Sequence, residues 1–374
     1  MSTLHAYVHV PFCRVRCGYC DFNTYTATEL QGFSQSDFVN QFAKELELSK
    51  RVLGSARHLE SIFFGGGTPT QLPASDLVDV LRLLDDSFGI AKGAEVTTEA
   101  NPDNVDGFYL EALRRGGFNR VSFGMQSAVS SVLETLERTH TPANVPKAIK
   151  AAKEQELQTS VDLIYGAPKE SMDDWKRSVD AAIELETDHI SAYALIVEEG
   201  TKLARQINRG ELPEPDEDLQ AAKYEWADAQ FAAAGLTWYE LSNWSRSKET
   251  ESKHNVAYWL GRDWWGYGPG AHSHLDGERW WNVKHPSAYA GKLAEGLSPE
   301  ADRETLTELQ KFEERVLLES RLATGLDLSI IENKDAVAGL IADDLIDAKA
   351  AFQGKLVLTL RGRLLADLVV RRLV

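Results

Sequence analysis

The cysteines are the residues whose type and spacing point most directly to chemistry. The chain has three, Cys13, Cys17 and Cys20, in one short segment with the spacing CxxxCxxC. Three thiolates at this spacing can bind three irons of a cubane cluster, which leaves the fourth iron open to a small molecule. A structural zinc site would need four closed ligands, and Pro11 and Gly18 favour a loop over a helix with a cysteine stripe. Because an odd number of cysteines also excludes a closed set of disulfides, we expect an iron–sulfur site.

A glycine run and several polar residues are the next candidates. Gly66 and Gly67 precede Thr68 after an apolar run, and glycines after a strand let the backbone approach a ligand closely. Alone this signal is weak, because glycines also form ordinary turns. Further polar residues lie at or near the ends of apolar runs: Glu99, Asn101, Gln126, Asp162 and Tyr193.

The elements that must position these residues alternate between strand-like and helix-like segments up to about residue 200. The expected strands are His5–Pro11, Leu59–Phe64, Glu95–Glu99, Arg120–Phe123, Ser160–Tyr165 and His189–Ile196. The expected helices are Ser36–Leu53, Pro73–Ser87, Asp106–Arg115, Pro142–Glu156 and Met172–Glu186. This alternation implies βαβ units and a parallel sheet, either an open doubly wound sheet or a full or partial βα barrel. We favour the barrel, because it gathers polar strand ends from many strands around one site, whereas an open sheet gathers them mainly at one crevice.

The composition changes after about residue 200. Eight of the nine tryptophans lie between Trp226 and Trp281, and four of the nine histidines lie between His254 and His285. Helix-like patterns then return at Leu306–Leu322, Ile330–Asp335 and Ala338–Asp347, followed by a β-like pair at Lys355–Leu360 and a helix at Gly362–Leu373. These helices and the short ribbon resemble a winged-helix module. We expect a barrel over residues 1–235, a Trp- and His-rich segment over 236–300 that completes the side of the barrel, and a winged-helix-like domain over 301–374.

Composition and charge exclude several classes of protein. The chain has 374 residues, of which 40 are basic and 57 acidic, for a net charge of −17, so broad binding of nucleic acid is not expected. No apolar stretch reaches the roughly 18 residues of a membrane span, and the first residues lack the basic and apolar regions of a signal peptide. We therefore expect a cytoplasmic protein without a transmembrane segment, in a compartment that disfavours disulfides.

The CxxxCxxC motif, with an aromatic residue before its last cysteine, resembles that of the radical S-adenosylmethionine (SAM) superfamily. In that superfamily SAM chelates the open iron of a [4Fe-4S] cluster, an electron cleaves its sulfonium to give a 5′-deoxyadenosyl radical, and the fold is a full or partial βα barrel. The resemblance implies that Cys13, Cys17 and Cys20 ligate the cluster. It also implies a set of SAM-binding residues, which in this chain are Tyr7, Tyr19, Gly66, Gly67, Thr68, Glu99, Gln126, Arg138, Asp162, Ala194 and His272.

The full order of motifs is similar to the oxygen-independent coproporphyrinogen III dehydrogenase family, called HemN, and to its HemW relatives. Three departures favour HemW. HemN enzymes carry a further cysteine two residues after the third, where this chain has Phe22. Their N-terminal extension has no counterpart before the expected first strand, and His254–Trp259 resembles the HNxxYW motif of HemW proteins.

HemW proteins are haem chaperones, which deliver haem to apo-haemoproteins such as respiratory enzymes. The resemblance implies haem binding by His254, Tyr258 and Trp259, and imidazole is the usual axial ligand of haem iron. Further candidates lie nearby: His272, His274, His285, Trp264 and Trp265. We expect a haem chaperone on a radical SAM scaffold, whose SAM and cluster regulate the protein, for instance by controlling a homodimer. The alternatives are oxidative decarboxylation of coproporphyrinogen III and another radical SAM reaction, such as methyl transfer, on an unrelated substrate.

Overall fold

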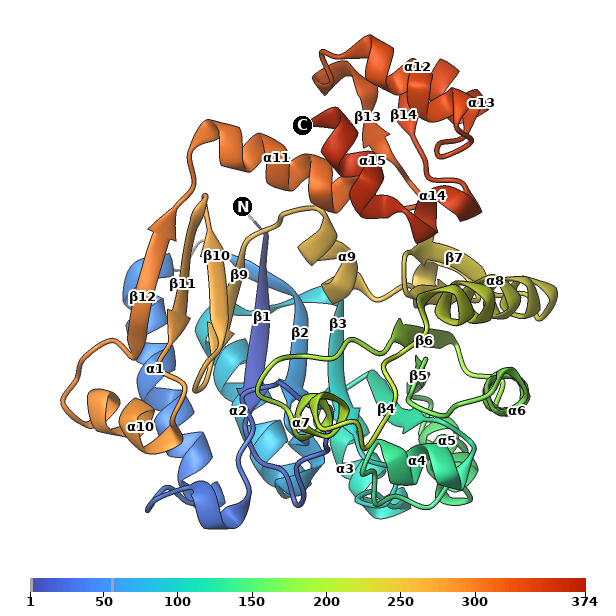
Figure 1. The fold of residues 1–374 in the computed structure, drawn as a ribbon. Helices are drawn as coiled ribbons and strands as arrows, with labels where there is room; N and C mark the ends of the chain where they lie inside the picture. The colour runs from blue at the N-terminus through green and yellow to red at the C-terminus, as the bar shows by residue number, and fades with distance from the viewer. Residues whose placement is uncertain (1–2, 55–56) are drawn as a thin grey trace.

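The computed structural model describes residues 3–54 and 57–374. Within this part, twelve strands form one mixed sheet in the order β12-β11-β10-β9-β1-β2-β3-β4-β5-β6-β8-β7. Figure 1 shows the sheet curving, with the C-terminal segment beside one end of it. Residues 1–2, which belong to the expected segment 1–235, and residues 55–56 lie outside the described part.

Six parallel strands form the centre of the sheet. They are β1 (Thr3–Val10), β2 (His58–Gly66), β3 (Ile90–Ala100), β4 (Arg120–Gln126), β5 (Gln158–Tyr165) and β6 (His189–Ala194). Each strand pairs in parallel with the next one along the chain. All six expected strands are confirmed. Since they run in parallel, their carboxyl ends meet at one edge of the sheet.

Helices connect these strands and pack on the outer face of the sheet. The predicted helices are confirmed as α1 (Phe38–Leu53), α2 (Ala74–Phe88), α3 (Gly107–Arg115), α5 (Asn144–Glu154) and α6 (Met172–Glu184), whereas α4 (Ser130–Thr135), α7 (Lys202–Asn208) and α8 (Glu217–Ala233) were not predicted. The apolar stripe of α1 and α2 explains their position. Phe42 of α1 and Leu81 of α2 are buried in one apolar cluster with Val8 and Ile62 of the sheet.

The sheet is extended on both sides by five strands from the Trp- and His-rich segment and by β12, which directly follows that segment. These are β7 (Thr237–Glu240), β8 (Asn243–Ser245), β9 (Trp264–Tyr267), β10 (His272–Leu275), β11 (Glu278–Asn282) and β12 (Glu300–Thr305). Strand β9 pairs in parallel with β1, while the remaining added strands pair antiparallel. In the described residues no pairing joins β12 to β7, so the barrel is partial rather than full.

Helix α9 (Lys253–Trp259) lies at the amino-terminal end of the parallel strands. The backbone amides of Lys253 and His254 donate to the Glu95 carboxylate of β3 at 2.9 and 3.2 Å. Arg120, the first residue of β4, donates to the carbonyl of Thr250 just before the helix, at 2.8 Å. These bonds fix α9 across the end of the barrel that is opposite to the carboxyl ends of the strands. Helix α10 (Pro286–Ala294) then leads to β12.

The C-terminal segment has an apolar cluster of its own, which includes Val316, Leu340 and Val369. Its elements are α11 (Glu308–Glu319), α12 (Lys334–Ala342), α13 (Ala348–Phe352), α14 (Leu360–Leu364), α15 (Ala366–Leu373) and the ribbon of β13 (Leu326–Asp327) and β14 (Lys355–Leu356).

Several details of this segment differ from the sequence-based expectation. The expected pair at Lys355–Leu360 contains only β14, whose partner is β13, and the expected helix Gly362–Leu373 is divided into α14 and α15. The predicted helix Ile330–Asp335 is wrong, because Asn333 accepts from the Ala336 amide and starts α12 at Lys334. The predicted helix Ala338–Asp347 is really the second half of α12, which ends at Ala342. None of the helices in the described part combines the length and apolar character needed to cross a bilayer.

Candidate functional site

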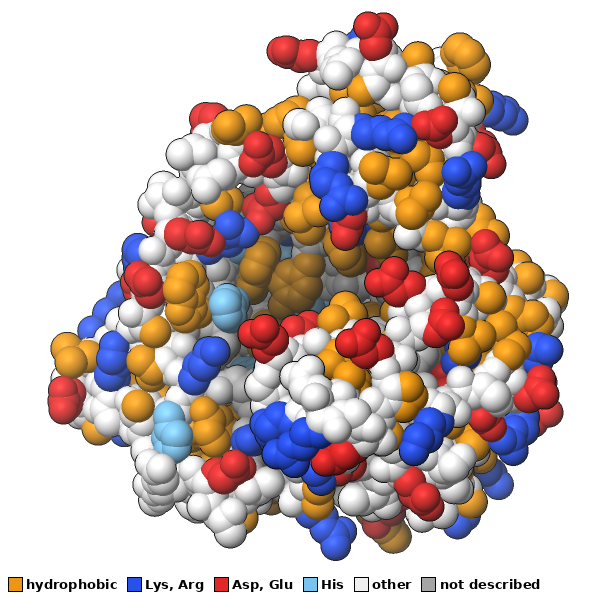
Figure 2. Space-filling model, in the orientation of Figure 1, with side chains coloured by type: hydrophobic (Ala, Val, Ile, Leu, Met, Phe, Trp, Pro, Cys, Tyr) orange, Lys and Arg blue, Asp and Glu red, His pale blue; other side chains and the backbone are white. Residues whose placement is uncertain are grey.

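A cavity of about 790 Å³ lies inside the partial barrel. Side chains from the cysteine segment, from β1 to β6 and from α9 line it, so it extends from the carboxyl ends of the strands to their amino ends. Figure 2 shows a hollow on this face of the molecule, below the C-terminal segment, with hydrophobic side chains in its depth and acidic ones on its rim. The gathering of polar strand-end residues around one cavity is the arrangement that a βα barrel produces.

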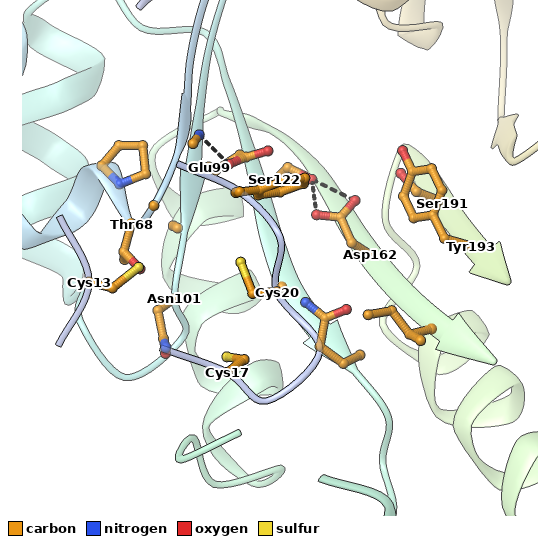
Figure 3. A pocket seen from close by; sticks show the side chains of 18 of the residues that line it. Cys13, Cys17, Cys20, Thr68, Glu99, Asn101, Ser122, Asp162, Ser191 and Tyr193 are labelled. Carbon is orange, nitrogen blue, oxygen red and sulfur yellow. Dashed lines mark hydrogen bonds between the residues drawn. The ribbon is translucent and has the colours of Figure 1, made fainter. Parts of the chain in front are cut away.

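The three cysteines follow β1 in a loop at the wall of this cavity (Figure 3). The Cys13 sulfur lies 3.8 Å from the Thr68 hydroxyl, and the Cys17 sulfur accepts a hydrogen bond from the Arg138 guanidinium at 3.7 Å. Burial raises the pKa of Cys20 to about 11 and also raises the pKa of Cys13. A cationic partner, such as a metal centre, would favour the thiolate forms of Cys13 and Cys20.

The donor set fits an iron–sulfur cluster better than a single metal ion. All three cysteines are free thiols and half-buried. In the part of the chain that the structure describes, no three His, Cys, Asp or Glu side chains converge closely enough to hold one ion. A cubane cluster places each thiolate on a different iron and so requires thiolates that are farther apart. The loop supplies three thiols and no fourth, which is the donor set of a cubane cluster with one open iron.

The glycine turn after β2 packs directly against the cysteine loop. The amide of Gly67 donates to the carbonyl of Val10, and the amide of Thr68 donates to the carbonyl of Phe12, both at 2.8 Å. A Cβ atom on Gly67 would lie 2.6 Å from the Phe12 carbonyl oxygen, so no side chain fits there. Gly66 has φ +109°, which favours glycine. The turn thus needs its glycines to bring the backbone close to the cysteine loop.

Two half-buried carboxylates face the cavity from β3 and β5, the strands on either side of β4 (Figure 3). Glu99 accepts from the amide of Gly66 at 3.3 Å, and Asp162 accepts from the hydroxyl of Ser122 at 2.9 and 3.1 Å. Burial, together with the charge of Asp162, raises the pKa of Glu99 to about 8. Burial also raises the pKa of Asp162. A cationic ligand in the cavity would offset this cost by favouring the ionised carboxylates.

Arg138 supplies a positive charge beside Cys17. Its guanidinium donates to the carbonyl of Gly124 at 3.0 Å and to the Cys17 sulfur. Gln126, at the end of β4, is buried and has φ +60°, a left-handed conformation that is uncommon for a residue with a side chain. Such strain is typical of residues held in place at functional sites.

The structure brings nearly all of the expected SAM-binding residues to this one cavity. Its lining includes Tyr7, Tyr19, Gly66, Gly67, Thr68, Glu99, Gln126, Arg138, Asp162 and Ala194. His272 differs from the expectation and is not part of that lining. It starts β10, two strands away from β1, where its exposed ring stacks on Trp281 at a centroid distance of 5.6 Å.

The three residues expected to bind haem divide between two cavities. His254 and Tyr258 line the main cavity, whereas Trp259 lines a second cavity of about 370 Å³. His254 is buried with both ring nitrogens engaged: Nδ1 lies 2.7 Å from the Ser61 hydroxyl and Nε2 lies 2.9 Å from the Tyr258 hydroxyl. Burial lowers the pKa of His254 to about 3, so its ring is neutral. To bind iron, His254 would have to give up one of these hydrogen bonds.

Several residues that line the main cavity belong to none of the motifs found in the sequence. They lie deeper in the barrel and include Phe63, Arg120, Ser122, Ser160, His189 and Ser191. The alternation of side chains along a strand could have found some of them. Ser122 lies two residues before Gly124, Ser160 two before Asp162, and Ser191 two before Tyr193, so each shares a face with a residue at the strand end.

The family model, the curated relatives and the solved structures that resemble this chain agree with one another. Residues 7–182 match the family model described as the Radical SAM superfamily. The chain is 47% identical to the Heme chaperone HemW of Mycobacterium tuberculosis, over 98% of this chain and 94% of that protein. It is 34% identical to the Heme chaperone HemW of Bacillus subtilis, over 86% of this chain and 84% of that protein. The structure of the coproporphyrinogen III oxidase HemN of Escherichia coli matches with a TM-score of 0.84 over 100% of this chain and 90% of that chain; at 23% identity this shows a shared fold.

Proposed function

Since this chain belongs to the HemW family, within the radical SAM superfamily, we propose that it binds haem and delivers it to apo-haemoproteins. The observation that carries this proposal is the 47% identity to a Heme chaperone HemW across 98% of the chain. That likeness includes both the cavity-lining strands and the C-terminal segment. The proposed clients are respiratory enzymes that contain haem. The proposed compartment is the cytoplasm, and the proposed assembly is a homodimer whose formation depends on the cluster.

The cysteine loop is the proposed site of a [4Fe-4S] cluster, with Cys13, Cys17 and Cys20 as its ligands. When bound, the cluster supplies one electron for reductive cleavage of SAM. The chain's own residues would hold SAM beside it. Arg138 offers a guanidinium to a carboxylate, and Glu99, next to the Gly66 amide, offers an acceptor to an amine or a ribose hydroxyl.

We also propose the division of the chain into a barrel over 1–235, a segment over 236–300 that completes its side and contributes to haem binding, and a winged-helix-like domain over 301–374. The separate apolar cluster around Val316, Leu340 and Val369 supports a distinct C-terminal unit, whereas the pairing of β12 with β11 favours a start after Thr305. Helix α9 is the proposed part of the middle segment that contacts haem, because Tyr258 and Trp259 reach two different cavities from it.

Coproporphyrinogen decarboxylation is the less favoured function. HemN enzymes carry a cysteine two residues after the third cluster cysteine, and Phe22 occupies that position at the wall of the main cavity. Phenylalanine can neither ligate a metal nor transfer a proton. The chain therefore lacks a thiol that the HemN motif places beside the cluster.

Two parallel incubations test the proposal. Anaerobically reconstituted protein is mixed with SAM, a reductant and coproporphyrinogen III, and the same preparation is titrated with haem. We expect the protein to form no more protoporphyrinogen than the variant in which Cys13, Cys17 and Cys20 are all replaced with Ala. We also expect a Soret band that saturates as haem is added. Sustained formation of protoporphyrinogen without haem binding would contradict the chaperone function and favour the dehydrogenase activity.

A further inference from the structure

The turn that brings Arg138 to the main cavity is a strained helix end. After α4 the amide of Glu137 donates to the carbonyl of Glu134 at 3.0 Å, and the amide of Arg138 donates to the carbonyl of Leu133 at 2.9 Å. These two bonds form a Schellman motif, whose left-handed position usually holds glycine. Here Glu137 occupies that position, with φ +55°. The turn fixes the backbone of Arg138, whereas its long side chain must be placed by other contacts.

Three hydrogen bonds place the guanidinium of Arg138. Nη2 donates to the carbonyl of Gly124 at 3.0 Å, and Nη1 donates to the Cys17 sulfur at 3.7 Å. The third bond runs from Nε to Nδ1 of His140, at 3.4 Å. A guanidinium carries five N–H donors, so these bonds leave donors for a ligand in the cavity. Arg138 lines that cavity, whereas His140 holds it from outside the lining.

The strand beside the guanidinium leaves it little room. A Cβ atom on Gly124 would lie 3.1 Å from Nη2 of Arg138 and 2.8 Å from Nε2 of Gln126. Both distances are shorter than ordinary contacts, so the guanidinium packs directly on the backbone of β4. Because the guanidinium is planar and rigid, a bond at Nε also sets the direction in which both terminal nitrogens point.

His140 is suited to accept this bond and not to contact a ligand. The residue is 4% exposed and lies outside the lining of the main cavity. Burial and the charge of Arg138 lower the pKa of His140 to about 4, against the opposing effects of Asp103 and the Met125 carbonyl. The ring is therefore neutral at ordinary pH, and a neutral ring that accepts at Nδ1 carries its proton on Nε2. A protonated ring could not accept from Nε of Arg138.

Loss of this acceptor has a definite consequence. A guanidinium N–H that is enclosed by protein without an acceptor is costly, so without His140 we expect Nε of Arg138 to turn toward another acceptor. Such a turn would move both terminal nitrogens with it. A ligand would then have to order the guanidinium as it binds, which lowers the affinity.

We propose that His140 is a positioning residue, which accepts from Nε of Arg138 and thereby directs the terminal N–H groups of Arg138 to the carboxylate of bound SAM. This inference rests on the proposed contact between Arg138 and SAM, and it adds a residue that touches neither the SAM cavity nor the cysteines. The effect of His140 on SAM is transmitted through Arg138 alone. The affinity for SAM should therefore depend on His140 only while Arg138 is present.

The test measures the Kd for SAM on the full-length reconstituted protein by calorimetry, and iron content checks that each variant keeps its cluster. His140→Leu has a similar volume and no acceptor. It should raise the Kd for SAM about three- to tenfold, which corresponds to the typical net contribution of one hydrogen bond. His140→Asn can place Oδ1 where Nδ1 stands, and its Kd should stay within about twofold of wild type. His140→Ala takes the place of the leucine variant if that variant does not fold.

A double-mutant cycle separates positioning from a merely structural role. Arg138→Ala should weaken SAM binding roughly ten- to hundredfold. Adding His140→Leu to that variant should raise the Kd by less than about twofold more, because the side chain on which His140 acts is gone. A substitution that only loosened the loop would weaken SAM binding in both backgrounds. His58→Leu is the matched control, because His58 lies 3.1 Å from the carbonyl of Phe88 and lines neither cavity, and its Kd should equal that of wild type.

The outcomes separate this inference from the contact on which it rests. A loss of affinity in His140→Leu that is absent in His140→Asn and vanishes in the Arg138→Ala background supports the inference. Wild-type affinity in His140→Leu overturns it while the contact between Arg138 and SAM stands. Equal losses in the leucine and asparagine variants, or equal losses in both backgrounds, also overturn it. Wild-type affinity in Arg138→Ala would remove the proposed contact itself, and this inference with it, without bearing on haem binding.

Discussion

The carboxylate of Glu99 accepts a hydrogen bond from the backbone amide of Gly66 over 3.3 Å. This bond joins the end of β3 to the glycine turn after β2. The same turn is bonded to the cysteine loop through the amide of Thr68 and the carbonyl of Phe12. One short chain of contacts therefore couples a titratable buried group to the segment that holds the cysteines.

Glu99 should make stability depend on pH. Its folded pKa of about 8 lies above the ordinary value of 4.5 because the side chain is buried. Between these two values the folded state holds a proton that the unfolded state has released, so the free energy of unfolding contributed by this group falls as pH rises. The side chain of Glu99→Gln is neutral at every pH. Between about pH 5 and pH 8 the free energy of unfolding should therefore fall less in this variant than in wild type, by at least about 1.4 kcal/mol, the equivalent of one pKa unit. Urea denaturation of cluster-free protein at several pH values measures this difference, and parallel pH profiles for the two proteins would contradict it.

Gly67 should not tolerate a side chain. In Gly67→Ala the new Cβ would meet the Phe12 carbonyl oxygen at 2.6 Å and the Phe12 amide nitrogen at 3.0 Å, and backbone atoms cannot move aside cheaply. We expect a loss of about 1–3 kcal/mol of stability and a lower iron content after reconstitution. Gly339→Ala, within α12 and with no atom within 4 Å of the new Cβ, is the control and should be neutral or stabilising. Equal iron content and stability for both variants would show that the turn does not need its glycine.

The cysteines should account for all cluster binding. Replacing Cys13, Cys17 and Cys20 together with Ala should abolish the broad visible absorption of the reconstituted protein, because no other thiol exists in the chain. Val15→Ala, an exposed position in the same loop, should keep it. Iron and sulfide analysis measures the outcome, and about four irons per chain in the triple variant would mean that the cluster is held elsewhere.

Arg138 should contribute to SAM affinity. Removing a buried charge-assisted partner typically costs about 1.5–3 kcal/mol, or roughly ten- to hundredfold in Kd, so Arg138→Ala should bind SAM that much more weakly. Arg114→Ala, an exposed position on α3, serves as the control. Calorimetric titration with SAM on reconstituted protein gives both values. Unchanged affinity in Arg138→Ala would remove the guanidinium from the proposed carboxylate contact.

Much of the barrel could be predicted because its signals are local. The parallel strands are short apolar runs separated by amphipathic helices, and polar residues such as Glu99 and Asp162 follow these runs closely in sequence. The strands β7 to β12 were missed because most of them are short. Two of them, β8 and β9, also pair with the distant strands β6 and β1, although β7 with β8 and β10 with β11 form local hairpins. His272 lies outside the lining of the main cavity, in β10, which β9 separates from β1.

The hydrogen bonding of the histidines had no sequence signal. His254 belongs to a recognisable motif, yet it is bonded to Ser61, which lies 193 residues earlier in the chain. His140 has no motif, and only its contact with the guanidinium of Arg138 distinguishes it. Which nitrogen of a histidine is free depends on such tertiary contacts. Sequence patterns can therefore name candidate histidines but cannot rank them.

The most direct test of the proposed function is the rate of haem transfer from the loaded protein to an apo-haemoprotein of the respiratory chain. The transfer is followed by absorbance over a range of acceptor concentrations, and apomyoglobin, which takes up dissociated haem, gives the spontaneous release rate. A chaperone is expected to transfer haem to its client at a rate that rises with client concentration and exceeds the release rate. A transfer rate that stays at the release rate whatever the client concentration, for every respiratory apo-haemoprotein tried, would contradict directed delivery.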